Sequence, residues 1–198
     1  VVIMATGAEE YAGPAYGLGT DERIMTQGEL EARIEHGELD PKSLKQVVMI
    51  QCVGPWDEAG DGDRPEFYCS RVCCTAATKN ALWLQELNPN IQVYVLYKDV
   101  RTYGYRERLY TQARERGVVY VRFDDDRKPQ VKLDGASGGI RVLVEDPVLH
   151  LPLALEPDAL VLSAKLNANQ LDSGLIDSVY SLVSDKDADP KLRSAAAG

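Results

Sequence analysis

Histidine is nearly absent from this chain, and no constellation for proton transfer can be assembled around it. The two histidines, His36 and His150, lie far apart in the sequence, and surface or satisfied core positions are the better interpretation of both. The three consecutive acids Asp124–Asp126 are interpreted as a solvated loop and not as a metal site. The sequence therefore does not favour general acid–base catalysis.

Long hydrophobic runs and an excess of positive charge are also missing. No apolar run approaches the ~20 residues that cross a bilayer. The first residues lack the charged region of a signal peptide. The net charge of −9 opposes binding to nucleic-acid phosphate, which requires a basic face. We therefore expect a cytoplasmic protein with no nucleic-acid partner.

The glycine-rich turn of dinucleotide-binding domains is missing too. Such a turn follows the first strand of a βαβ unit and seats a pyrophosphate on a helix N-terminus. Here the strand expected at Lys45–Gln51 is followed by Cys-Val-Gly-Pro-Trp at residues 52–56. An acidic loop over residues 56–66 would repel phosphate further. The sequence therefore indicates that the nucleotide has been exchanged for another cofactor.

The hydrophobic pattern that is present alternates between strands and amphipathic helices. Thr26 and Glu29 form a capping-box signature, so a helix is expected from Gln27 to about His36. The other elements expected are helices at 70–86, 105–116 and 175–183, and strands at 1–4, 91–97, 118–123, 131–133, 140–144, 151–155 and 159–163. This order predicts an α/β fold with a Rossmann-like parallel sheet, crossover helices and an antiparallel β-meander. That is the layout of the NAD(P)-binding domain of thioredoxin-reductase-type flavoproteins.

All four cysteines lie where the nucleotide would otherwise bind. Cys52, Cys69, Cys73 and Cys74 have the spacing C-x16-C-x3-C-C, and the last three would lie beside a helix N-terminus that favours thiolates. Four thiolates are the usual complement of one [4Fe–4S] cluster, and they also suffice for a tetrahedral zinc site. The adjacent pair matches neither zinc knuckles nor common ferredoxin runs. Spacing alone leaves open a cluster, a zinc ion, or buried free thiols with a redox disulfide.

Three sequence blocks around these cysteines resemble a known family. The blocks are residues 50–54 (Ile-Gln-Cys-Val-Gly), 68–74 (Tyr-Cys-Ser-Arg-Val-Cys-Cys) and 96–104 (Leu-Tyr-Lys-Asp-Val-Arg-Thr-Tyr-Gly). They are similar to the flavoprotein A-subunit of heterodisulfide reductases, with the flavoprotein subunits of the quinone-interacting membrane-bound oxidoreductase as relatives. The resemblance implies a thioredoxin-reductase-like core that binds FAD. It also implies a [4Fe–4S] cluster with the ligands Cys52, Cys69, Cys73 and Cys74.

The resemblance also assigns flavin contacts. Ala5, Thr6 and Gly7 match the segment that returns from the FAD domain and would face the flavin. Ser163 and Ala164 lie near the matching return crossing. The family's glycine-rich FAD fingerprint and its ferredoxin-like cysteine runs are absent from the sequence.

We therefore expect a fragment of a longer polypeptide, inactive as an isolated oxidoreductase. A strand that starts at the first residue is also unusual for a complete domain. The expected divisions are residues 1–44, a segment returning from the FAD domain plus a linker helix; 45–166, a Rossmann-like inserted domain with the cysteines; and 167–198, a C-terminal helix and tail.

The leading hypothesis for function is an electron-transfer module. It would relay electrons between FAD and the other subunits of a redox complex, reach a membrane only through a partner subunit, and allow a homodimer. A pyridine-nucleotide-dependent disulfide oxidoreductase domain is the first alternative, but it would need the missing phosphate turn. A zinc-stabilised interaction domain without redox function is the second.

Overall fold

The computed structural model describes residues 7–54, 69–134, 138–148 and 150–168. Residue contacts divide the chain into two compact units. The larger unit, residues 10–165, contains the helices and the two larger sheets. The short strands β1 (Ala8–Glu10) and β10 (Leu166–Ala168) pair as a separate two-stranded sheet.

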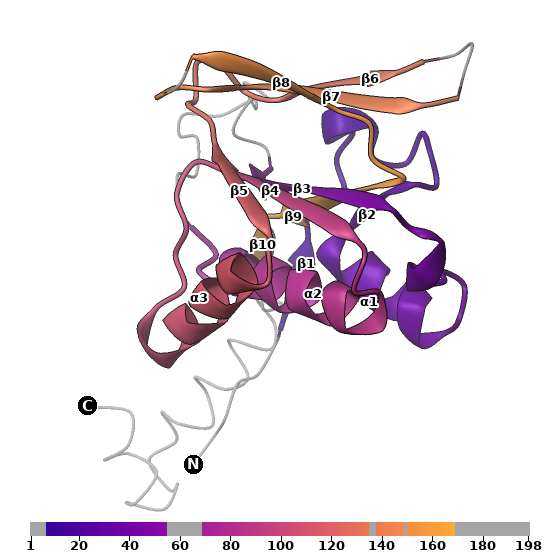
Figure 1. Cartoon of the computed structure of the whole chain (residues 1–198), viewed down its shortest axis with the longest axis vertical. Helices are drawn as coiled ribbons and strands as arrows, with labels where there is room; N and C mark the ends of the chain where they lie inside the picture. Colours follow the sequence, from indigo (N-terminus) through magenta and orange to yellow (C-terminus); the bar gives the residue numbers. More distant parts are fainter. Residues whose placement is uncertain (1–6, 55–68, 135–137, 149, 169–198) are drawn as a thin grey trace, which may run out of the picture. The chain divides into compact units, whose positions relative to one another are not determined.

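A five-stranded parallel sheet forms the centre of the larger unit (Figure 1). Its order is β2–β9–β3–β4–β5, and every neighbouring pair is parallel. The strands are β2 (Ile24–Thr26), β9 (Ala159–Ala164), β3 (Gln46–Val53), β4 (Gln92–Tyr97) and β5 (Val119–Arg122). The chain steps outward from β3 to β4 and β5 and then returns to β9 on the other side of β3. This reversal creates a topological switch point at the carboxyl ends of β3 and β9.

Three helices cover one face of this sheet (Figure 1). They are α1 (Gln27–Glu35), α2 (Cys73–Leu87) and α3 (Glu107–Glu115), and the short 3-10 turns are η1 (Ala15–Gly17), η2 (Pro41–Ser43) and η3 (Gly104–Arg106). The predicted capping box of α1 is confirmed. The Glu29 amide donates to Thr26 Oγ1 at 3.2 Å, and the Thr26 amide donates to Glu29 Oε2 at 2.7 Å. Both orphan donors at this helix start are therefore satisfied.

An antiparallel sheet of three strands covers the opposite face (Figure 1). Its strands lie in the order β6 (Gln130–Leu133), β7 (Ile140–Asp146) and β8 (Leu151–Leu155). Two core layers result. Val47 and Met49 of β3 pack in the layer on the helix side, whereas Val48 and Ile50 pack in the layer against β7. Alternate side chains of β3 are thus buried on both faces, which is why its sequence is continuously apolar.

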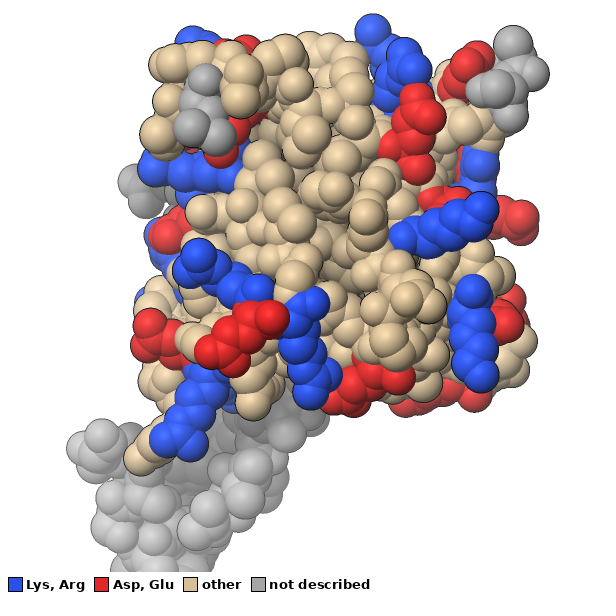
Figure 2. Space-filling model, in the orientation of Figure 1, with Lys and Arg blue, Asp and Glu red and all other residues tan. Residues whose placement is uncertain are grey.

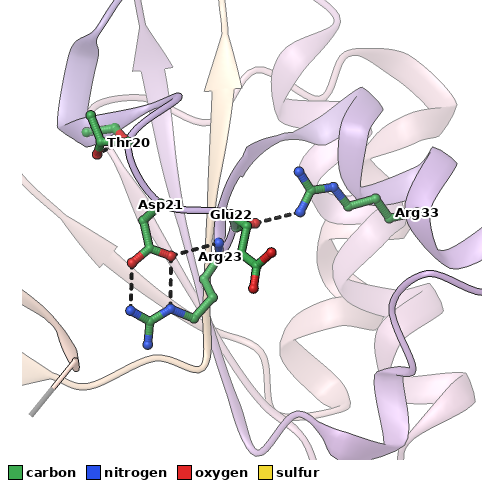
Figure 3. A network of polar contacts seen from close by, with 6 residues as sticks. Thr20, Asp21, Glu22, Arg23 and Arg33 are labelled. Carbon is green, nitrogen blue, oxygen red and sulfur yellow. Dashed lines mark hydrogen bonds and ion pairs between the residues drawn. The ribbon is translucent and has the colours of Figure 1, made fainter.

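A polar network fixes the chain just before β2 (Figure 3). The Arg23 guanidinium donates two hydrogen bonds to the Asp21 carboxylate, at 2.9 and 2.6 Å, and the Arg23 amide donates a third at 2.9 Å. These hydrogen bonds hold the pKa of Asp21 at about 2. Arg33 of α1 donates to the Glu22 carbonyl at 2.5 Å, so the helix is tied to the same turn.

The predicted fold class is confirmed, including the order of the crossover helices and the meander. The strand β2 was not predicted, because three residues directly before a helix are too few to show a strand period. The strand expected at 1–4 and the helix expected at 175–183 lie outside the described residues. The divisions at 44/45 and 166/167 stay predictions, although contacts group residues 10–44 with the larger unit. No helix in the described part of the chain has the length and apolarity to cross a membrane.

Candidate functional site

A cavity of about 370 Å³ lies at the carboxyl ends of the parallel strands. Its lining comes from β3, from the residues that lead into α2, from the segments after β4 and β5, and from the end of β9. The lining residues are Cys52, Cys69, Ser70, Cys73, Cys74, Lys98, Asp99, Arg101, Asp125, Ser163 and Lys165. Open α/β sheets bind their ligands in this crevice. The fold therefore gathers all four cysteines at the place where a related domain would hold a nucleotide.

Cys52 reaches the cavity from an irregular stretch of β3. The pairing of β3 with β9 shifts register between Ile50 and Val53, and Cys52 has a φ of 61°. Positive φ is uncommon for a residue other than glycine, and it is typical of bulges that redirect a side chain. The expectation that the strand ends at Gln51 is wrong: β3 continues to Val53, and Cys52 is part of it.

The other three cysteines lie at the start of α2. The helix begins at Cys73, three residues later than expected, and its first turn carries Cys73 and Cys74. The Arg71 amide donates to Cys69 Sγ at 3.4 Å. The Cys73 thiol donates to the Ala164 carbonyl at 3.6 Å, and the Cys74 thiol donates to the Asp99 carbonyl at 3.7 Å. Both thiols are thus anchored to the segments that follow the neighbouring strands.

Burial is the largest influence on three of the thiols. It raises the pKa of Cys52 to about 11; Cys74 adds to the rise, and the Lys98 ammonium opposes it. Burial also raises the pKa of Cys73, against a hydrogen bond from Ser70, and the pKa of Cys74, against a backbone hydrogen bond from Arg101. These three thiols are protonated at neutral pH without a ligand, so a metal or cluster has to displace their protons.

The four thiols are close enough to act on one bound group. Every pair among them interacts electrostatically, and all four are free thiols. Among the described residues, however, no three His, Cys, Asp or Glu side chains are arranged to share a single metal ion. The thiols line a cavity instead of converging on a point, which suits a group of several atoms better than one ion.

The other residues assigned from sequence are only partly brought to this site. Ser163 lines the cavity and accepts a hydrogen bond from Gln27 Nε2 at 3.1 Å, and the Ala164 carbonyl contacts Cys73. Gly7 has a φ of 72° and belongs to the other compact unit. Ala5 and Thr6 lie outside the described residues. The flavin contacts therefore stay predictions.

Several residues of the cavity were not predicted. Asp125, interpreted as part of a solvated loop, pairs with Lys98 at the rim. Lys165 is only 4% exposed, although it follows the last strand directly. Gln51, beside Cys52, is 2% exposed, and neither atom of its amide has a hydrogen-bond partner among the described residues. A lysine or acid directly after each predicted strand was the available signal, because parallel strands bring their carboxyl ends together.

Comparisons with known proteins agree with this placement. No family model matches the chain. The A-subunit of the ferredoxin:CoB-CoM heterodisulfide reductase of Methanosarcina acetivorans is 33% identical over 91% of this chain and 28% of its own length. This chain is a relative of the heterodisulfide reductase A-subunits. The H2/formate-dependent relative from Methanococcus maripaludis is 35% identical over 87% of the chain, and the iron-sulfur relative from Methanocaldococcus jannaschii is 34% identical over 84%.

The chain spans about a quarter of the length of these heterodisulfide reductase subunits. Among solved structures, the FAD-bound cadaverine monooxygenase of Erwinia amylovora matches 92% of the chain and 48% of its own, with a TM-score of 0.53 and 10% identity. That likeness concerns the fold alone. The family resemblance inferred from the three sequence blocks is confirmed.

Proposed function

We propose that the cavity holds a [4Fe–4S] cluster through Cys52, Cys69, Cys73 and Cys74. The observation that carries the proposal is the convergence of four free thiols, from β3 and from the start of α2, on one cavity at the switch point. When bound, such a cluster accepts and releases single electrons. The segment would therefore be the electron-carrying part of an oxidoreductase subunit.

The surroundings of the sulfurs support this assignment. The Arg71 amide already donates to Cys69 Sγ, and the Arg101 amide donates to Cys74. Hydrogen bonds to sulfur and burial are the means by which a protein adjusts the potential of a cluster. The N-terminus of α2, which bears Cys73 and Cys74, adds a positive dipole next to the thiolates. No proton-transfer residue is required for one-electron transfer.

The alternative of a pyridine-nucleotide site is less well supported. Its pyrophosphate would rest on the first turn of a helix after the first strand of the βαβ unit. In this chain Cys73 and Cys74 occupy that turn, and Cys52 precedes the turn's remaining glycine, Gly54. Few backbone N–H groups are left to converge on a phosphate.

The role of the whole protein is inferred from its relatives. Their names describe subunits of heterodisulfide reductases. We infer that the full-length protein binds FAD, with Ala5, Thr6, Gly7, Ser163 and Ala164 near the flavin, and passes electrons to partner subunits. A homodimer, a cytoplasmic setting and contact with a membrane only through a partner complete the proposal. The segment alone would be inactive in catalysis because most of the relatives' length lies outside it.

The test is an anaerobic reductive titration of protein reconstituted with iron and sulfide. Dithionite should reduce it with about one electron per chain, with a bleached charge-transfer band and an EPR signal. Cys52→Ser should lose most of this signal; because the chain has no fifth cysteine, the unreconstituted wild type is the control. NADH should show no saturable binding. Saturable NADH binding competed by ADP-ribose, or no uptake of electrons, would overturn the proposal.

A further inference from the structure

The cysteine cavity reverses the charge balance of the chain. The sequence has 31 acidic and 22 basic residues. On the face shown in Figure 2, basic and acidic side chains lie beside each other around the margin instead of gathering by sign. The cavity, in contrast, is lined by three cations, Lys98, Arg101 and Lys165, and by two acids, Asp99 and Asp125. The local excess of positive charge coincides with the four thiols.

Two of the three cations form ion pairs with the two acids. Lys98 pairs with Asp125, and Arg101 Nε lies 2.7 Å from Asp99 Oδ2. The Lys98 and Arg101 side chains are 26% and 44% exposed, so solvent weakens their effect on the cavity. Within the lining, the excess charge is therefore that of Lys165.

Lys165 is held at the cavity by its own backbone. It follows β9 directly, its amide donates to the Val53 carbonyl at 2.7 Å, and its carbonyl accepts from the Tyr11 amide at 2.8 Å. Val53 ends β3, the strand that carries Cys52, so both residues belong to the same end of the sheet. The residue is 4% exposed, and a charged group is rarely buried to this extent unless an anion is close.

We propose that Lys165 raises the reduction potential of the group held by the four cysteines. This inference rests on the proposed cluster. Four thiolates outweigh the positive charge of a cluster core, so one more electron increases an already negative charge in a poorly solvated site. A buried ammonium nearby stabilises the reduced form more than the oxidised form. Lys165 is a positioning residue in this sense: its fixed charge favours arrival of the electron without binding the iron.

The experiment is an EPR-monitored redox titration of the reconstituted protein. Lys165→Met removes the charge at similar length, and Lys165→Arg keeps it. We expect Lys165→Met to lower the ratio of reduced to oxidised cluster at the wild-type midpoint on the order of tenfold, which corresponds to ~59 mV for one electron. Lys165→Arg should restore most of the wild-type potential. Lys132→Met, which changes an exposed lysine of β6, is the matched control and should leave the potential unchanged.

The outcomes separate this inference from the proposed function. Wild-type protein without iron and sulfide would overturn the proposed function and the inference with it. A loaded Lys165→Met protein with the wild-type potential, or a shift equal to that of Lys132→Met, would overturn the inference alone. If Lys165→Met does not fold, Lys165→Gln, which keeps hydrogen-bond donors but no charge, replaces it under the same criterion. Melting of each unloaded variant shows whether the substitution acts on the fold instead.

Discussion

At the scale of single residues, Thr26 connects two parts of the fold. Its hydroxyl accepts the Glu29 amide as the helix cap and donates to the Glu10 carboxylate at 2.5 Å. Glu10 also accepts from the Gly28 amide at 3.4 Å. The same threonine therefore caps α1 and holds the segment that precedes η1.

Thr26→Ala should lower the free energy of unfolding by about 1–2 kcal/mol, since loss of a threonine cap alone costs about 1 kcal/mol. Urea unfolding measures the change. Thr111→Ala alters an exposed threonine of α3 and should stay within about 0.5 kcal/mol of the wild type. Equal losses in the two variants would show that the cap contributes nothing.

Asp21 gives the fold a pH dependence of known sign. Its pKa is about 2 in the folded chain because of the hydrogen bonds from Arg23, and about 3.9 in an unfolded chain. Its contribution is therefore present above about pH 5 and is lost as the pH falls through about 2. The Arg23 side chain is 38% exposed, so solvent limits the effect to about 1 kcal/mol or less.

Asp21→Asn should consequently destabilise the protein at pH 7 and converge with the wild type near pH 2 to 3. Urea unfolding across this range gives the difference. Asp126→Asn, at an exposed acid, should show no such convergence because no difference should exist at pH 7. A difference for Asp21→Asn that is constant with pH would rule out the ion pair as its cause.

At the scale of elements, a buried polar chain joins α1, α2 and β9. Asn80 Nδ2 donates to Gln27 Oε1 at 2.8 Å, and Gln27 Nε2 donates to Ser163 Oγ at 3.1 Å. All three side chains are at most 3% exposed. Ser163 also lines the cysteine cavity, so this chain connects the helix layer with the site.

Asn80→Ala should lower the free energy of unfolding by about 2–3 kcal/mol, because it leaves the buried Gln27 amide oxygen without its donor. Thermal or urea unfolding measures this loss. Asn90→Ala, at an exposed asparagine after α2, is the control and should change stability by less than about 0.5 kcal/mol. A loss below that limit for Asn80→Ala would mean that water replaces the missing donor.

The elements also show which local features a sequence can predict. The capping box of α1 follows from two residues three apart, and it is present. The bulge at Cys52 is different, because it depends on how β3 pairs with β9, more than a hundred residues later in the chain. The burial of Lys165 and Gln51 is equally non-local. A pattern of single residues cannot contain these features.

At the scale of the whole molecule, the order of strands and helices predicted the sheet and therefore the site. Once parallel strands and crossovers were inferred, the residues after Ile50, Tyr97 and Ser163 had to meet at one edge. The three matched blocks predicted the family. The charges around the cavity could not be predicted as a group, because Asp125 and Lys165 lie outside those blocks.

The central claim is that the four cysteines hold one iron–sulfur cluster in the place of a nucleotide. The most direct measurement is the iron, sulfide and zinc content of the protein after anaerobic reconstitution and gel filtration. We expect about four irons and four sulfides per chain, the content of one cluster with four thiolate ligands. Stoichiometric zinc with no iron, or iron without sulfide, would contradict the claim.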